Sequence, residues 1–480
     1  MNLKNVIKTM YQIAKGTPKA PELYDISDRI EQYASWYAGN VASFHNYDVF
    51  NGKKHVHLRR YSLGMAKRVC EDWANLLMNE KTDIVLGDEQ SQKTIEDIFA
   101  KNKFWRRANK NVEKYFALSI GAWVVSVENL PVNERGEIVS PDGDVKITLL
   151  HGSNIVPITI ESEEVTECAF LSCNTNYADI VLHIKNERGE YVIASLRAYG
   201  KNQNYNFNIE EMQLFDTKSA TPWYVILQPH IANNIDIDSP LGISIFANSI
   251  DTLKEIDLVF DSLANEFALG KKRIFINEIP SYKTDPVTGD EVPVFDSNDV
   301  VIYQLPENDD GKQTITDVTQ SLRVTEHNDG LQRLLNLLSY QCGFGTEHYK
   351  FDAGSIATAT QIISENSEMF RNIKKQEILI EDALISLVHA VAYAVNNFTK
   401  GHIDDEKEVN VVFDDSIIED KGSEIANDRL DVQLGVMSKA EYRAKWYGET
   451  EEEAQKKIDE MSVFSIADTD YTTGEGEGNE

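Results

Sequence analysis

The amino-acid sequence predicts an α+β protein in which helical and β-rich regions follow one another along the chain. Three observations predict it: a helical pattern over roughly the first 120 residues, β-rich runs from about 123 to 224, and a helix–insert–helix–loop–helix segment between 238 and 398. The 480 residues suffice for two to four structural units, each with its own core. A hydrophobic fraction of 42% is typical of a folded chain.

The charge balance of the chain is strongly acidic. The chain has 78 acidic and 47 basic residues, so its formal net charge is −31. A static DNA-binding protein usually presents a basic face, because its affinity comes from neutralising phosphates. The composition argues against such a protein, but it suits a surface past which DNA slides without sticking.

Cysteine usage and hydropathy indicate the compartment. Four scattered cysteines are too few for a disulfide framework, which predicts folding in a reducing cytoplasm. The start of the chain has no signal-peptide core. The longest apolar stretches, Tyr115–Val127 and Ala383–Val395, fall short of the roughly 20 residues of a membrane span. We therefore expect a soluble protein without a membrane partner.

The helical N-terminal region contains two basic aromatic stretches, Lys53–Arg60 and Lys101–Lys114. Either could contact phosphate, and the favoured alternative is a solvated helix face. His55 and His57 would share one face if this stretch were a strand, but a metal site is not predicted because no third ligand is near. Downstream, β-rich runs with turns at Asp142-Gly143 and Arg188-Gly189 predict a mostly antiparallel sheet region.

A pair of amphipathic helices enclosing an insert comes next. The first helix repeats apolar residues at spacings of three and four from Ile250 to Phe267 and stops at Gly270. The insert reads as short strands around a turn at 285–290. A second helix is expected from about Val324 to Cys342, followed by a flexible glycine-bracketed loop of about a dozen residues.

One long helix, from about Ala357 to Asn397, completes this segment without an internal Pro or Gly. At 1.5 Å per residue it would be about 60 Å long and would need neighbours along its length, for which oligomerisation is the simplest source. A strand at Val409–Phe413 and three short helices follow. The acidic, Gly-rich end from 467 to 480 is predicted to be disordered.

Motifs of covalent chemistry are missing from the sequence. A phosphate-binding G-x-x-x-x-G-K-[ST] loop, a G-x-S-x-G elbow, H-E-x-x-H and paired C-x-x-C are all absent. Acidic pairs such as Asp236/Asp238 lack calcium-loop spacing and read as turn caps. The sequence therefore predicts no enzyme, no catalytic residue, no metal and no cofactor.

Several runs of residues resemble one family. They are N-N-I-D-I-D-S-P-L-G-I-S-I-F (Asn233–Phe246), E-F-A-L-G-K-K-R-I-F-I (Glu266–Ile276), G-S-I-A-T-A-T-Q-I-I-S-E-N-S (Gly354–Ser367), A-N-L-L-M-N-E (Ala74–Glu80) and G-V-M-S-K-A-E-Y-R (Gly435–Arg443). Together they resemble the portal proteins of tailed bacteriophages, most closely those of siphophages of Gram-positive hosts. The resemblance covers nearly the whole chain and preserves the order of elements.

The resemblance implies a portal fold, with long helices around a central channel in a ring-shaped homo-oligomer. It divides the chain as follows: wing 1–244, first stem helix 245–270, clip 271–321, second stem helix 322–343, tunnel loop 344–356, long wing or crown helix 357–398, wing strand and crown helices 399–466, and tail 467–480.

The function that the resemblance implies is a ring, typically of twelve subunits, at one capsid vertex. DNA would enter and leave through its channel, so double-stranded DNA is an expected partner. The other expected partners are the terminase large subunit, a head–tail adaptor, and the major capsid and scaffolding proteins. Assembly would occur in the host cytoplasm, and the mature location is the virion. The alternatives are a non-ring component of the head or baseplate and, less favoured, a packaging enzyme.

The resemblance also implies roles for individual residues. Facing DNA from the tunnel loop would be Phe344, Glu347, His348, Tyr349 and Lys350. Docking of terminase and adaptor at the clip would use Tyr282, Asp285, Asp290, Glu291 and Phe295. At the end of the first stem helix, Lys271, Lys272 and Arg273 would cap the helix or form ion pairs between subunits.

Overall fold

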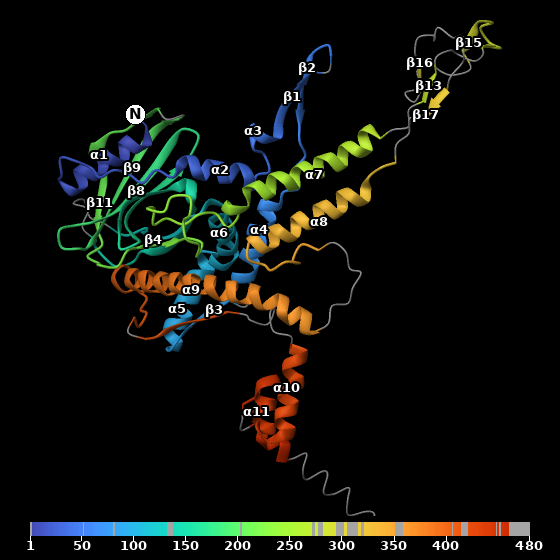
Figure 1. Ribbon diagram of the computed structural model, residues 1–480. Coiled ribbons are helices and arrows are strands. Elements are labelled where there is room, and N and C mark those ends of the chain that lie inside the picture. Colours follow the sequence, from blue (N-terminus) through green and yellow to red (C-terminus); the bar gives the residue numbers. More distant parts are fainter. Residues whose placement is uncertain are drawn as a thin grey trace, which may run out of the picture. The chain divides into compact units, whose positions relative to one another are not determined.

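The computed structural model divides the chain into two compact units, Met1–Phe413 and Asp414–Glu480 (Figure 1). It describes residues 2–50, 52–79, 82–131, 138–201, 204–270, 274–276, 282–293, 302–304, 315–317, 321–350, 359–405, 407–413, 421–447, 449–450 and 453–459. Helices and sheets mix throughout the first unit, which confirms the predicted α+β class.

A six-stranded sheet covered by the N-terminal helix forms one part of the first unit. Its strand order is β10-β9-β8-β7-β6, with β11 also paired to β9, and every pairing is antiparallel as predicted. Helix α1 (Leu3–Lys15) places Val6, Ile7 and Met10 against this sheet, all fully buried. The strands are β6 (Ile155–Glu161), β7 (Glu164–Cys173), β8 (Tyr177–Lys185), β9 (Tyr191–Lys201), β10 (Asn204–Asn206) and β11 (Gln213–Asp216).

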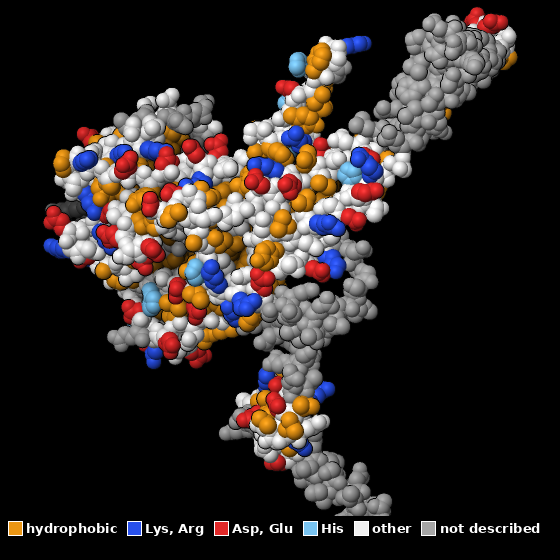
Figure 2. Space-filling model, viewed as in Figure 1, with side chains coloured by type: hydrophobic (Ala, Val, Ile, Leu, Met, Phe, Trp, Pro, Cys, Tyr) orange, Lys and Arg blue, Asp and Glu red, His pale blue; other side chains and the backbone are white. Residues whose placement is uncertain are grey.

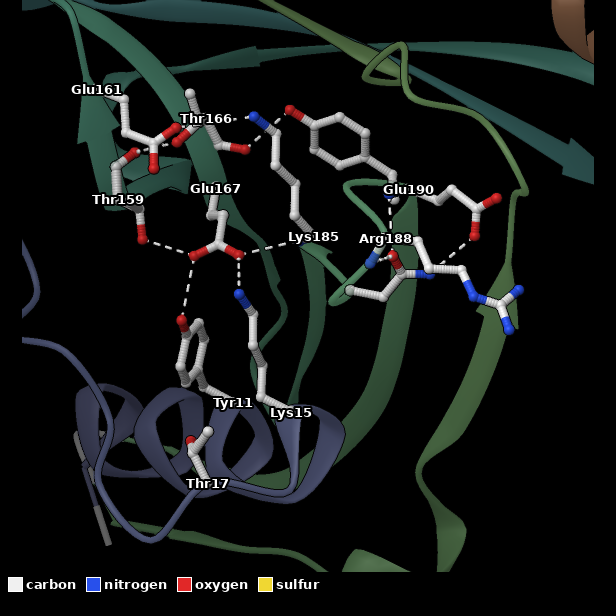
Figure 3. A network of polar contacts seen from close by, with 12 residues as sticks. Tyr11, Lys15, Thr17, Thr159, Glu161, Thr166, Glu167, Lys185, Arg188 and Glu190 are labelled. Carbon is white, nitrogen blue, oxygen red and sulfur yellow. Dashed lines mark hydrogen bonds and ion pairs between the residues drawn. The ribbon is translucent and has the colours of Figure 1, made fainter.

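A buried carboxylate fastens helix α1 to the sheet (Figure 3). Glu167 on β7 lies 2.6 Å from the Lys15 ammonium and accepts hydrogen bonds from the hydroxyls of Tyr11 and Thr159. The backbone N–H of Lys185 donates to the same carboxylate at 2.9 Å. Burial alone would raise the pKa of Glu167, but these donors outweigh it and hold the pKa below its usual 4.5.

Five further helices and a three-stranded sheet also contribute to the core among the described residues. The sheet has the order β12-β4-β5, built from β4 (Gly121–Glu128), β5 (Asp144–His151) and β12 (Tyr224–Leu227). Large aromatic side chains fill the interior: Trp73, Phe104, Phe116, Trp123 and Trp223 are each at most 1% exposed. The helices are α2 (Ser27–Tyr37), α3 (Ala42–His45), α4 (Met65–Leu77), α5 (Glu89–Lys101) and α6 (Phe104–Leu118), with 3-10 turns at Gly152–Asn154, Ile209–Glu211 and Ala247–Ser249.

The N-terminal region is not purely helical, and here the sequence interpretation was wrong. Residues 46–59 form a hairpin of β1 (Asn46–Phe50) and β2 (His55–Arg59), and β3 (Asp83–Leu86) is a further strand. The basic stretch at 53–60 therefore lies in this hairpin and not on a solvated helix face. Its apolar residues alternate with period two, and Gly52 adopts a positive φ of 88° at the turn.

The long helix α9 (Ala359–Phe398) has 40 residues, close to its predicted bounds. Its C-terminal half packs on β4 and β12, and it also contacts β18 (Val409–Val412), which pairs antiparallel with β3. Leu384, Leu387 and Val391 are fully buried, so this half finds its neighbours within the chain. Its segment Glu368–Phe398 contains an 18-residue window that is apolar enough for a membrane span by length and composition. Because 56% of that window is buried inside the protein, it has the character of a core helix.

The second unit contains the predicted short helices. They are α10 (Lys421–Leu434), α11 (Lys439–Tyr447) and a helix at 453–459. Asp428 on α10 accepts a hydrogen bond from the Trp446 indole at 2.8 Å and pairs with Lys445 on α11. The predicted disordered tail, 467–480, lies outside the described residues.

Candidate functional site

The predicted stem is a pair of antiparallel helices, α7 (Ile250–Leu269) and α8 (Val324–Gln341). At one end the Thr252 hydroxyl donates to Gln341 at 2.8 Å, and toward the other the Ser262 hydroxyl lies 3.0 Å from the His327 ring. The apolar stripe of α7 is fully buried only in the first half of the helix. Ile256 is completely buried, whereas Phe267 is 54% exposed. Both helices therefore leave the core and carry apolar side chains into solvent.

Two aspartates near the middle of α7 tie it to the segment that follows β2. Asp257 lies 3.0 Å from the His45 ring and accepts the backbone N–H of Leu63 at 2.8 Å. One turn later, Asp261 accepts the backbone N–H of Tyr61 at 3.0 Å. Sequence reasoning missed this site. The signal was present, because two acidic residues four apart beside a buried apolar stripe need partners from elsewhere in the chain.

An ion pair joins the far ends of the two helices. Arg323 makes two side-chain hydrogen bonds to Glu266, at 3.0 and 2.9 Å. The Arg323 guanidinium lowers the pKa of Glu266 to about 2. The predicted stem cations Lys271, Lys272 and Arg273 lie outside the described residues.

The insert between these helices forms two small sheets. In one, β13 (Ile274–Ile276) is flanked by β16 (Ile302–Gln304), parallel to it, and β17 (Ile315–Asp317), antiparallel. The other is the hairpin of β14 (Tyr282–Thr284) and β15 (Glu291–Pro293) around the predicted turn.

Four of the five predicted docking residues lie in the β14–β15 hairpin. Tyr282 begins β14, and Asp285 accepts the backbone N–H groups of Val287 and Thr288, which lowers the pKa of its carboxyl. Asp290 and Glu291 are exposed on the other side of the turn. Phe295 lies outside the described residues.

The first half of the predicted tunnel loop packs its aromatic side chains onto the core. Phe344 is 3% exposed and lies 5.1 Å from the Trp73 ring, between centroids. Tyr349 is 8% exposed, and its hydroxyl donates to Asp72 on α4 at 3.1 Å. The rings of Phe344 and Tyr349 belong to the subunit interior, because removing such large aromatic surfaces from water is favourable. They are not available to DNA in this structure.

The charged side chains of the same segment are exposed. Glu347 and Lys350 form an ion pair at 2.9 Å, and the His348 ring stacks on Phe344 with centroids 4.4 Å apart. The His348 ring also lies 3.5 Å from Asp72, which is held by Arg68. The buried aromatics thus fix a short segment that presents Glu347, His348 and Lys350 to solvent. Residues 351–356 of the predicted loop lie outside the described residues.

Among the described residues, no group of three or more His, Cys, Asp or Glu side chains is arranged to hold a metal ion. All four cysteines are free thiols, and Cys173 alone of the four is exposed. The site thus consists of a helix pair, an insert and a charged segment whose positions are set by buried carboxylates and aromatics.

Comparisons with known proteins identify the family. The family model described as "Phage portal protein, SPP1 Gp6-like" matches residues 22–463. The chain therefore belongs to this family of phage portal proteins, which are generally structural proteins of the capsid and not enzymes. No curated protein matches. Among 86 matching chains of solved structures is one titled "Neck of native GTA particle computed with C12 symmetry". It is 10% identical, with a TM-score of 0.44, over 92% of this chain and 98% of that one.

Proposed function

We propose that this chain assembles into a ring of twelve subunits at one capsid vertex and forms the channel through which DNA is packaged and ejected. The observation that carries the proposal is the antiparallel pair α7 and α8, with an insert at one end and the charged segment 344–350 at the other. Repeated around an axis, such a pair is a wall of helices. The parent phage is a siphophage of a Gram-positive host in this proposal.

The proposed division of labour follows the elements. Residues 245–270 and 322–343 form the stem, 271–321 the clip, and 1–244 the wing. The clip binds first the terminase large subunit and then the head–tail adaptor, and the wing meets the major capsid and scaffolding proteins. The long helix 357–398 joins wing and crown, and 399–466 supplies a wing strand and crown helices. The exposed carboxylates of Asp290 and Glu291 support a docking role for the clip, since they are free of the core.

Electrostatics support a channel in which DNA moves freely. Helix α7 carries five acidic residues and one lysine, and Asp251 and Glu255 are exposed among them. Such a wall repels phosphates and prevents the tight binding that counterion release would drive. The tunnel loop 344–356 would supply brief contacts through His348 and Lys350, with Glu347 limiting their strength.

Imaging of the purified protein tests the ring. Negative-stain electron microscopy is expected to show rings with a central hole, and class averages give the subunit number. A protein that remains monomeric at high concentration under every assembly condition would overturn the proposal.

The charged segment is tested separately by substitution. We expect His348→Ala with Lys350→Ala to leave ring formation unchanged and to lower the amount of DNA packaged or retained in an infection assay. The matched control is Lys400→Ala with His402→Ala, which removes the same two residue types at the same spacing from an exposed turn outside the stem. If the control and the loop variant package DNA equally well, the segment does not contact DNA.

A further inference from the structure

We propose that the β1–β2 hairpin is an arm that packs onto a second copy of this chain. The inference rests on the proposed ring and adds a specific contact to it. Residues 46–59 form a two-stranded sheet, which Figure 1 shows standing away from the helices and larger sheets of the first unit. The proposed division of labour gives this hairpin and its basic stretch no role of their own.

The register of the hairpin separates its side chains into two faces. Tyr47 pairs with Leu58 and Val49 with Val56, so four apolar side chains share one face. On the other face, Asn46 pairs with Arg59, Asp48 with His57 and Phe50 with His55, so this face is polar apart from Phe50 near the tip. This is the pattern of a strand pair that is covered on one side and wet on the other.

The apolar face is only partly covered by the subunit itself: Tyr47 and Val56 are half-buried, and the Arg60 guanidinium lies over the Tyr47 ring. Val49 and Leu58 on this face are each 40% exposed. Figure 2 shows hydrophobic side chains along this hairpin and basic side chains at its tip. An isolated two-stranded hairpin is marginally stable in water, so a surface that covers this face would stabilise it. A protein surface provides that cover, because apolar side chains gain little from DNA phosphates.

The charge of the hairpin indicates which protein covers it. Four basic residues and one acidic residue give 46–60 a charge of +3, while the chain as a whole carries −31, which leaves −34 for the remainder. A second copy of the chain is therefore an acidic partner present at equal concentration.

The base of the hairpin is held by hydrogen bonds, as expected for a projecting arm of set direction. Asp257 and Asp261 on α7 accept the backbone N–H groups of Leu63 and Tyr61, and the Arg60 side chain donates to the backbone carbonyl of Phe44. The direction of the hairpin is thus set before a partner arrives. Pre-ordering reduces the entropy lost on association, so a small contact contributes more to assembly.

The decisive experiment replaces the apolar face and measures assembly. The variant carries Val49→Ser and Leu58→Ser in the full chain. The matched control carries Ile235→Ser and Ile237→Ser, since these two side chains are 53% and 88% exposed outside the hairpin. Mass photometry over a concentration series gives the fraction of rings, and thermal unfolding of the monomer reports folding. We expect the hairpin variant to need about tenfold more protein for half-assembly, a shift worth about 1.4 kcal/mol, with monomer unfolding unchanged.

Two outcomes would overturn the inference while leaving the ring intact. In the first, the wild type forms rings and the hairpin variant assembles at the same protein concentration as the wild type. The other is unchanged assembly with weakened binding of double-stranded DNA by a Lys53→Glu, Lys54→Glu variant, which would make the hairpin a nucleic-acid contact. Absence of rings in the wild type overturns the proposed function and the inference together. If the serine variant unfolds early, the charge-reversal variant, which alters only the tip, takes its place in the assembly assay.

Discussion

Three buried carboxylates among the described residues are each held by two or more donors. Glu167 receives four, Asp257 is held by His45 and a backbone N–H, and Asp72 by Arg68 and Tyr349. A buried carboxylate costs several kcal/mol of desolvation unless its oxygens are satisfied, so each network fixes one arrangement of its elements. Asp72 and Asp257 fasten the proposed loop and the hairpin base, whereas Glu167 fastens helix α1.

The Glu167 network predicts an acid-sensitive contribution to stability. We expect Glu167→Gln to lower the free energy of unfolding at pH 7 by about 2–3 kcal/mol, because it leaves Lys15 half-buried without its partner. The native pKa of Glu167 is lowered, so the ionised form contributes stability above its usual value of 4.5. That contribution falls as pH drops below 4.5 and is lost once pH passes the lower native pKa. Urea unfolding between pH 3 and about 8 measures the effect.

The control for this measurement is Glu164→Gln on the same strand, since Glu164 is exposed. It should change stability by less than about 0.5 kcal/mol at any of these pH values. A gap between wild type and Glu167→Gln that stays constant down to pH 3 would contradict the pKa argument.

At the scale of elements, two glycines of the stem are expected to respond oppositely to alanine. Gly330 lies inside α8, and no neighbouring atom lies within 4 Å of the position that a Cβ would take, so Gly330→Ala should stabilise the monomer by about 0.5–1 kcal/mol. Gly343, just after α8, has a φ of +85°, and a Cβ there would lie 3.1 Å from Asn372 and 3.3 Å from Trp73. Gly343→Ala should cost at least about 1–2 kcal/mol from the left-handed backbone alone.

Each glycine variant serves as the other's control, since both add one methyl group to the same region. Chemical denaturation of the monomer gives both values. Equal effects of the same sign would show that the turn at Gly343 relaxes, and that it does not hold Phe344 against Trp73.

The sequence predicted most accurately those helices whose apolar residues recur with a strong period. Helix α8 begins at Val324 as expected, and α9 lies within two residues of its predicted bounds. Both carry long apolar patterns that local sequence determines. The β1–β2 hairpin was missed because five-residue strands in a helical context give a short pattern, and its apolar face is left exposed.

At the scale of the whole molecule, the boundary between the two units makes a prediction about truncation. A chain ending at Phe413 keeps β18 and its pairing with β3, so its first unit should unfold at the same temperature as in the full protein. A chain ending at Asp405 loses β18 and leaves the edge of β3 unpaired beside α9. Its unfolding temperature should fall by roughly 2 °C or more, since an unfolding entropy of about 2.1 cal/mol/K per residue makes each kcal/mol worth about 1 °C in a unit of this size.

Differential scanning calorimetry of the two truncated chains provides this test, because both lack the second unit and differ only in β18 and its flanks. Equal unfolding temperatures would show that β18 adds nothing to the first unit. A lower temperature for the chain ending at Phe413 than for the full protein would show that the second unit stabilises the first.

The sequence predicted the helices and turns that form the candidate site, but not the contacts that their side chains make. Sequence pattern located both helices of the proposed stem, the turn from Asp285 to Asp290 and the segment after Gly343. It assigned Phe344 and Tyr349 to a solvent-facing loop because flanking glycines suggest flexibility. Their burial depends on Trp73 and Asp72, which lie more than 250 residues earlier in the chain and leave no local signal.

The sequence by itself determined the α+β class, the long helices, the antiparallel sheet region and, through its motifs, membership of the portal family. These depend on periodicity and residue order, which are local properties. Tertiary structure alone decided which charges are buried, which half of α9 is covered, and that the basic stretch at 53–60 is part of an amphipathic hairpin. Such features depend on contacts between residues far apart in sequence, and their energies arise only once the chain has folded.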